Sequence, residues 1–269
     1  MDILIAVGVL FAVAVVCALI LTLATKYFGV KEDETALAIR DCLPGANCGA
    51  CGYSGCDAYA KALADGTATE TNLCVPGGDS TAKAVAAILG VEAEDVIEKV
   101  AYVACRGTCD AAGKRYEYRG HKTCRTANMA YSGEKLCSYA CLGYGDCVAV
   151  CPQGAISTES GIARIDQSKC IGCGICVREC PNSIIHLVDD VSRVIIKCSS
   201  HEKGADTRKA CTNGCIGCMK CQKTCPHGAI TVTDNLATID YSLCTGCGAC
   251  ADVCPVKCIQ KGVFTGATH

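Results

Sequence analysis

The sequence predicts an α+β protein with an apolar N-terminal helix, a small glycine-rich module and two tandem copies of one cysteine-rich unit. Three observations predict this organisation. A charge-free apolar run opens the chain, one cysteine spacing recurs after 74 residues, and 28 of the 269 residues are cysteine. With ten tyrosines, three phenylalanines and no tryptophan, the core is poor in large side chains. Such a core needs disulfides or metal to hold it.

The cysteine spacing decides in favour of metal. The run from Cys170 to Pro181 reads C-x2-C-x2-C-x3-C-P, which is the ferredoxin pattern. In it three thiolates bind one [4Fe-4S] cluster and the fourth binds a neighbouring cluster. Disulfide frameworks do not repeat this spacing, yet a shift of 74 residues carries the run onto Cys244–Pro255. We therefore expect two tandem two-cluster ferredoxin-like units in a reducing compartment.

The first cysteine run of unit 1 departs from the pattern. Tyr144 stands where unit 2 has Cys218, so unit 1 either has three thiolates here or recruits another cysteine. We expect Cys137 to be the substitute. The crossing rule then predicts four clusters. Their ligands are Cys137, Cys141, Cys147 and Cys180; Cys151, Cys170, Cys173 and Cys176; Cys215, Cys218, Cys221 and Cys254; and Cys225, Cys244, Cys247 and Cys250.

A fifth cluster is expected near the N-terminus. Cys48, Cys51, Cys56 and Cys74 read C-x2-C-x4-C-x17-C among glycines, whose backbone amides can approach cluster sulfurs. A zinc site is the alternative, since it also uses four cysteines. A helix predicted over 54–64 would place Cys56 in its first turn, where the helix dipole favours thiolate. Cys42 lies outside the pattern.

Five cysteines remain after Cys42 is set aside and Cys17 and Cys258 are taken as apolar, packed thiols. They are Cys105, Cys109, Cys124, Cys198 and Cys211. We expect Cys105, Cys124, Cys198 and Cys211 to hold a sixth [4Fe-4S] cluster; structural thiols are the alternative. Residues 114–125 are rich in lysine and arginine, so they form either a solvated face or a docking surface for an acidic protein.

The predicted boundaries follow from these motifs. Two short helices are expected at 81–89 and 92–103, and hairpins at 156–166 and 230–240, where apolar and polar residues alternate. The parts are a transmembrane anchor (1–26), a linker (27–36), the glycine-rich module (37–78), a helical connector with the basic segment (79–135), ferredoxin-like unit 1 (136–190), a linker (191–213), unit 2 (214–262) and a tail (263–269).

The anchor prediction rests on residues 3–25, which carry no charged side chain. A helix of this length, at about 1.5 Å per residue, spans a hydrocarbon core of about 30 Å. The chain opens with Met1-Asp2, which is unlike a signal peptide. The first basic residues, Lys26 and Lys31, follow the run, so the cofactor domains are expected on the cytoplasmic side of the bilayer.

The sequence lacks the motifs expected for nucleotide binding, nucleic-acid binding or an ion path. The chain has no G-x-G-x-x-G after a predicted strand and no P-loop, so no nucleotide or NAD site is expected. The net charge of −2 gives no indication of nucleic-acid binding. One anchor without a charged residue cannot form an ion path.

The order of anchor, glycine-rich Leu43–Cys56 motif with Cys74, and doubled ferredoxin region resembles the B subunits of the Rnf complex. That resemblance implies an electron-transfer subunit of a membrane-bound, ion-translocating ferredoxin:NAD⁺ oxidoreductase. Its partners would be reduced ferredoxin and other subunits, with NAD⁺ reduction and Na⁺ or H⁺ translocation occurring elsewhere in the complex. Residues 43–74 would be the exit module. The alternatives are a membrane-anchored polyferredoxin serving a hydrogenase or another oxidoreductase, and a zinc scaffold.

Overall fold

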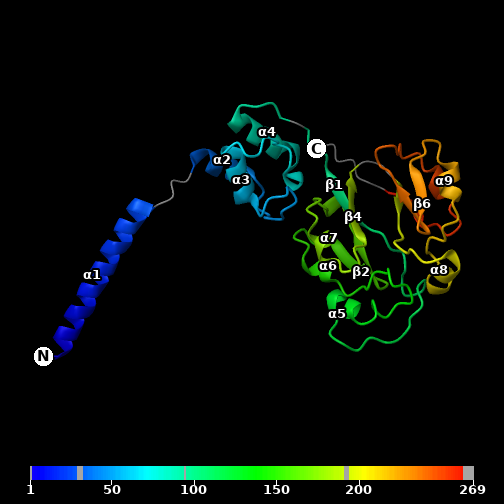
Figure 1. The fold of residues 1–269 in the computed structure, drawn as a ribbon, viewed down its shortest axis with the longest axis horizontal. Coiled ribbons are helices and arrows are strands. Elements are labelled where there is room, and N and C mark those ends of the chain that lie inside the picture. The colour runs from blue at the N-terminus through cyan, green and yellow to red at the C-terminus, as the bar shows by residue number, and fades with distance from the viewer. Residues whose placement is uncertain (1, 29–32, 94, 191–193, 263–269) are drawn as a thin grey trace.

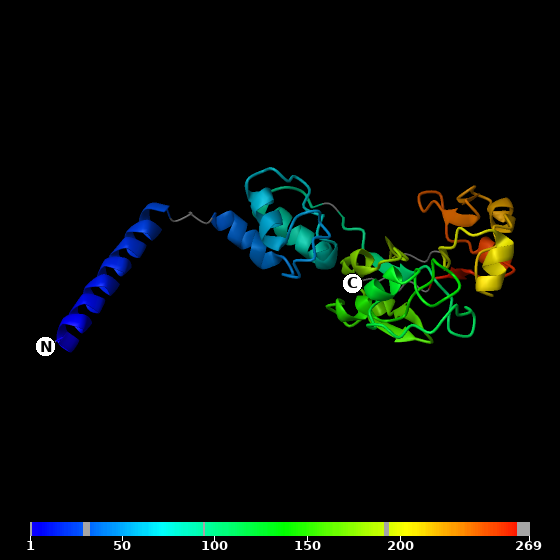
Figure 2. The same cartoon turned by 60° about the horizontal axis from the view of Figure 1, so that its bottom comes forward.

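The computed structural model describes residues 2–28, 33–93, 95–190 and 194–262. The first helix, α1 (Asp2–Phe28), precedes a helical module of α2 (Glu34–Cys42), α3 (Cys56–Ala64), the 3-10 turn η1 (Val75–Gly77) and α4 (Gly78–Leu89). Ile39, Tyr59 and Val85 are fully buried in the core of this module. In both views the module, unit 1 and unit 2 follow one another along the molecule (Figures 1 and 2).

The anchor prediction is not confirmed by the fold. In the described part of the chain, no helix combines the length and the apolar character needed to cross a membrane.

Unit 1 contains two antiparallel strand pairs. Strand β1 (Lys99–Val103) pairs with β4 (Ile185–Asp189), and β2 (Ile156–Glu159) pairs with β3 (Ile162–Ile165) in the predicted hairpin. Three short helical elements, α6 (Asp146–Ala149), η2 (Gln167–Lys169) and α7 (Ile175–Glu179), carry or flank its cysteines. Between β1 and the first cysteine run lies α5 (Cys124–Met129).

Unit 2 repeats this plan. Its hairpin is β6 (Ile230–Thr233) with β7 (Leu236–Ile239), again as predicted, and β5 (Val194–Ile196) pairs with β8 (Ile259–Lys261). Its helices are α8 (Gly204–Ala210), α9 (Lys220–Thr224) and α10 (Ala249–Asp252). The predicted tail, 263–269, lies outside the described residues.

The helix predicted at 92–103 is wrong, because its second half is strand β1. Val100, Tyr102 and Val103 are β-branched or aromatic and favour a pleated surface, and pairing with β4 buries all three. In unit 2 the equivalent strand, β5, lies in the segment predicted as a linker. Each unit therefore begins earlier than the cysteine spacing predicted, with a strand that closes its second pair.

Candidate iron–sulfur sites

The structure gathers 24 cysteines into six groups of four, and we name the groups in their spatial order from the N-terminal module. They are group A (Cys48, Cys51, Cys56, Cys74), group B (Cys151, Cys170, Cys173, Cys176), group C (Cys124, Cys141, Cys147, Cys180), group D (Cys105, Cys137, Cys198, Cys211), group E (Cys215, Cys218, Cys221, Cys254) and group F (Cys225, Cys244, Cys247, Cys250).

Groups A and B contain the cysteines expected from their motifs. In group A, burial raises the pKa of Cys74 to about 11, and the three other cysteines of the group add to the rise. The Asn47 side chain accepts a hydrogen bond from the Cys56 amide (2.8 Å) and so fixes the start of α3. In group B, burial raises the pKa of Cys176 to about 11, again with its three partners nearby.

Group E also follows the crossing rule, and group F is the set that the same rule assigns. The four cysteines of group E line one pocket, and burial raises the pKa of Cys221 to about 11, with the three other cysteines nearby. In group F, Cys244 and Cys247 lie near Cys250, whose pKa is raised by burial and by their charge. Cys225 packs against the same core as Cys250.

Group C differs from its predicted composition, because Cys124 and not Cys137 joins Cys141, Cys147 and Cys180. These four line one pocket. Burial raises the pKa of Cys147 to about 12, and Cys141, Cys124 and Cys180 add to the rise. The position left without a cysteine at Tyr144 is thus completed by α5, which lies between β1 and the first cysteine run of unit 1.

The local structure explains how Cys124 reaches this position. The Asp146 carboxylate accepts hydrogen bonds from the backbone amides of Cys124 (2.9 Å) and Arg125 (3.1 Å). Thr123 caps α5 by accepting from the Thr126 amide. Because Asp146 directly precedes Cys147, it ties the start of α5 to the cysteine run of unit 1. The Tyr144 ring packs edge-on against Tyr118 (5.9 Å between centroids).

Group D contains Cys137 in place of the predicted Cys124. Its four cysteines line one pocket between the units. Burial raises the pKa of Cys137, and Cys105 and Cys211 lie near enough to raise it further. Cys105 and Cys137 come from unit 1, and Cys198 and Cys211 from unit 2.

The two halves of group D are related by the duplication. Cys105 and Cys198 each follow a strand, β1 and β5, by two residues. Cys137 and Cys211 each precede the first cysteine of a run by four residues. The Cys105 sulfur accepts a hydrogen bond from the Gly107 amide (3.3 Å), and the Cys198 sulfur accepts one from the Ser200 amide (3.5 Å). In both cases the donor lies two residues after the cysteine. This symmetry is the sequence signal that would have assigned Cys137 correctly.

Three pairs of neighbouring groups, A with B, C with D and D with E, are joined by hydrogen bonds. The Cys141 amide of group C donates to the Cys105 sulfur of group D (3.3 Å), and the Cys215 amide of group E donates to the Cys198 sulfur of group D (3.2 Å). At the other end, the Arg178 guanidinium beside group B donates to the Cys48 carbonyl of group A. The charge of Cys48 also raises the pKa of Cys173.

These surroundings fit iron–sulfur clusters. Burial raises the pKa of Cys147, Cys176 and Cys221, and repulsion from the neighbouring cysteines raises it further, so gathering four thiolates is costly unless a metal centre neutralises them. Further backbone amides donate to ligand sulfurs, from Ala101 to Cys170 (3.4 Å) and from Ala163 to Cys141 (3.3 Å). Among the described residues, no three His, Cys, Asp or Glu side chains are close enough together for a single metal ion.

The remaining cysteines lie outside the six groups. Cys17 is exposed on α1, Cys42 packs in the core of the helical module, and Cys109 is exposed. Cys258 is buried beside group E, with its sulfur 3.6 Å from that of Cys254. Its hydrogen bond lowers the pKa of Cys254 to about 5, so Cys258 acts as a donor toward a group E ligand.

Comparison with known proteins agrees with this geometry. Three family models match: an FeS model for an iron–sulfur cluster at residues 43–76, a 4Fe-4S binding domain at 163–186 and a 4Fe-4S dicluster domain at 214–258. The B subunit of the Na⁺-translocating ferredoxin:NAD⁺ oxidoreductase complex of Acetobacterium woodii is 46% identical over 265 residues, 98% of this chain and 79% of that relative. The chain belongs to the family of Rnf complex B subunits.

Other Rnf B subunits match over similar lengths. The B subunit of the proton-translocating ferredoxin:NAD⁺ oxidoreductase complex of Clostridium ljungdahlii is 41% identical, over 96% of this chain and 92% of the relative. The B subunit of the ion-translocating oxidoreductase complex of Methanosarcina acetivorans is 40% identical, over 94% of each. The chain is thus an iron–sulfur subunit of an ion-translocating oxidoreductase complex.

In the basic segment of this Rnf B subunit, three of the five lysine and arginine side chains form ion pairs. Lys114 pairs with Glu134 (3.0 Å), Arg119 with Glu117 (2.9 Å) and Arg125 with Glu179 (3.4 Å). The Arg115 guanidinium donates to the Leu136 carbonyl and to Ser138. These contacts favour the solvated-face interpretation over a docking surface.

Proposed function

We propose that this Rnf B subunit relays electrons, one at a time, from reduced ferredoxin to membrane partner subunits. The observation that carries the proposal is the series of six cysteine groups, A to F, in which D contacts both C and E through ligand amides. A [4Fe-4S] cluster, when bound, supplies one-electron redox chemistry at each group. NAD⁺ accepts a hydride, so its reduction requires a two-electron cofactor on another subunit.

The revised ligand sets are part of this proposal. Groups A, B, E and F hold clusters as their motifs predict, group C uses Cys124, and group D uses Cys137. The chain's own contribution is to bury the sulfurs, to donate backbone amides to them and to fix the spacing of neighbouring groups. All three act on cluster potential or on the rate of transfer between clusters.

Group A is proposed as the exit toward the membrane subunits. It lies in the module between α1 and unit 1, on the opposite side of unit 1 from unit 2 (Figure 1). In Cys51→Ala, ferredoxin should still reduce the other clusters, while NAD⁺ reduction by the assembled complex should stop. Normal NAD⁺ reduction by this variant would remove group A from the path.

We also propose that residues 1–26 anchor the subunit in the lipid bilayer of the cell membrane, with the cofactor domains on the cytoplasmic side. The charge-free run 3–25 and the basic residues after it support this. A chain lacking residues 1–26 should appear in the soluble fraction with its iron retained. Full-length chain that alkaline washing strips from membranes would contradict the anchor.

The experiment that tests the relay uses the full chain, purified without oxygen. Reduced ferredoxin should bleach the visible absorbance of the chain, and added NAD⁺ alone should not restore it. Restoration by NAD⁺ in the absence of other subunits would contradict the assignment. Co-purification with Rnf subunits, and not with a hydrogenase, would exclude the polyferredoxin alternative.

A further inference from the structure

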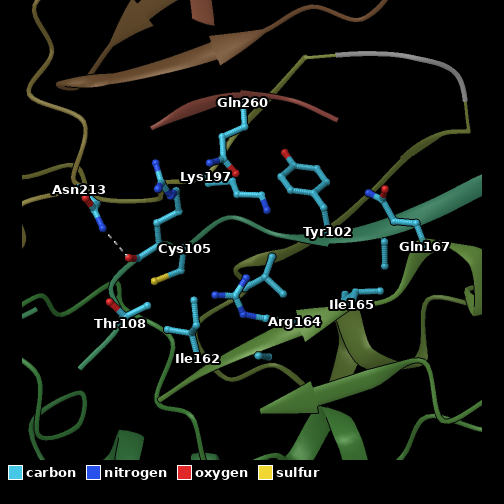
Figure 3. A pocket seen from close by; sticks show the side chains of 14 residues that line it. Tyr102, Cys105, Thr108, Ile162, Arg164, Ile165, Gln167, Lys197, Asn213 and Gln260 are labelled. Carbon is cyan, nitrogen blue, oxygen red and sulfur yellow. Dashed lines mark hydrogen bonds between the residues drawn. The ribbon is translucent and has the colours of Figure 1, made fainter. Parts of the chain in front are cut away.

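A polar cavity of about 400 Å³ lies between unit 1 and unit 2, and it is distinct from the pockets lined by groups C, D and E. Figure 3 shows Lys197 and Gln260 reaching into it from one side and Tyr102, Arg164 and Gln167 from the other. The volume is within the range of small-molecule sites in proteins. Cys105 of group D lines one end.

All the charged side chains that line this cavity are cationic. Arg106, Arg164 and Lys197 line it, and no aspartate or glutamate does. Arg164 forms an ion pair with Glu159 (2.9 Å). The Arg106 guanidinium donates a hydrogen bond to the Lys257 carbonyl, and this neutral acceptor leaves the charge of Arg106 uncompensated. Within the described residues Lys197 has no ion-pair partner.

Holding these cations together costs free energy. Arg106, Arg164 and Lys197 line the same cavity, and like charges repel one another there. An anion between the three side chains would remove this repulsion, and guanidinium groups match the geometry of oxyanions through paired hydrogen bonds. The amides of Gln167, Gln260 and Asn213 add neutral donors and acceptors around the same space.

We propose that this cavity binds a small, multiply charged oxyanion. Its position between the two units, with Lys197 and Gln260 from unit 2 and Arg164 from unit 1, means that the ligand contacts both. The site takes no part in holding any of the six cysteine groups, although Cys105 lies at its edge.

The test is equilibrium dialysis of the iron-loaded full chain against three probes. Pyrophosphate tests phosphate alone, ADP tests phosphate joined to a base, and citrate tests carboxylate alone. At least one probe should bind saturably, and Lys197→Met, which keeps the side-chain length, should weaken it by about tenfold or more. Arg164→Gln should weaken the same probe.

Lys83→Met is the matched control, because it removes one positive charge from the exposed face of α4 and should leave binding unchanged. Whichever probe binds identifies the ligand class. Two results would overturn the proposal. One is the absence of saturable binding by all three probes. The other is a Lys197→Met chain with wild-type affinity and full iron content.

Discussion

The backbone amide of Cys141 donates a hydrogen bond to the sulfur of Cys105 at 3.3 Å, so a group C residue directly contacts a group D sulfur. The Cys215 amide makes the equivalent bond to Cys198 at 3.2 Å. Group D therefore takes one contact from each ferredoxin-like unit. The two units thus share one cysteine group, which lies between them.

The revised ligand sets predict distinct effects on iron content. Six clusters hold about 24 irons per chain. Cys124→Ser should lose about four irons from group C, and Cys137→Ser about four from group D, with different clusters missing from the EPR spectrum of each reduced variant. Cys109→Ser is the control and should lose none, because Cys109 belongs to no group. Loss of the same cluster in both cysteine variants would contradict the assignment.

Lys135 is expected to stabilise the region between groups C and D. It is buried, and its ammonium donates to the carbonyls of Gly107 and Gly161, both at 2.7 Å. Its charge also favours the thiolates of Cys141 and Cys211. Lys135→Met leaves two carbonyls unsatisfied, at about 2–4 kcal/mol in total.

Thermal unfolding of the iron-loaded Lys135→Met chain should therefore show a midpoint several degrees lower. The midpoint potentials of groups C and D should also fall, because a nearby positive charge favours the reduced, more negative cluster. Lys122→Met, at an exposed position, is the control. Unchanged unfolding and unchanged potentials in Lys135→Met would contradict the role.

Asp146 is expected to hold Cys124 in place. Its carboxylate accepts the amides of Cys124 and Arg125, so Asp146→Ala should cost about 1 kcal/mol, as loss of a helix cap does. In Asp146→Ala the group C cluster should be lost to a chelator faster than in wild type, because Asp146 holds Cys124 beside the cysteine run. Asp146→Asn keeps one acceptor oxygen and should give an intermediate rate. Equal chelation rates in wild type and Asp146→Ala would count against this role.

Cys258 should raise the midpoint potential of the group E cluster. Its thiol lies 3.6 Å from the Cys254 sulfur, and hydrogen bonds to ligand sulfurs stabilise the reduced state. Cys258→Ala should lower the potential of group E alone in an EPR-monitored titration. The 74-residue shift places Ile184 at the same position beside group C, so Ile184→Cys should raise the potential there. If the midpoint potential of group E is the same in Cys258→Ala and in wild type, Cys258 does not raise that potential.

The repeated spacing predicted much of the fold and of the candidate sites. The two hairpins occur where alternation predicted them, and the structure brings together the cysteines of groups A, B and E that their motifs place together. These features depend on local sequence, because cysteines a few residues apart are brought together by the backbone of a single loop or short helix. Strands β1 and β5 were missed because each is short and pairs with a strand far along the chain.

The exchange of Cys124 and Cys137 has a similar cause. Cys137 is nearer in sequence to Cys141, and nearness was the basis for placing it in group C. What places Cys124 there is a tertiary contact, through Asp146, that no spacing encodes. The role of Cys137 was visible in its alignment with Cys211, since twin cysteines of a duplicated unit can converge on a shared group.

The central claim is that group D joins the two units in one relay. The most direct test is rapid-freeze EPR of the assembled complex carrying Cys211→Ser, after mixing with reduced ferredoxin. With ferredoxin entering at unit 2, at the end of the series opposite the proposed exit at group A, we expect the clusters of groups E and F to become reduced, those of groups A, B and C to stay oxidised, and NAD⁺ reduction to stop. Reduction of all five remaining clusters at the wild-type rate, with normal NAD⁺ reduction, would contradict the claim.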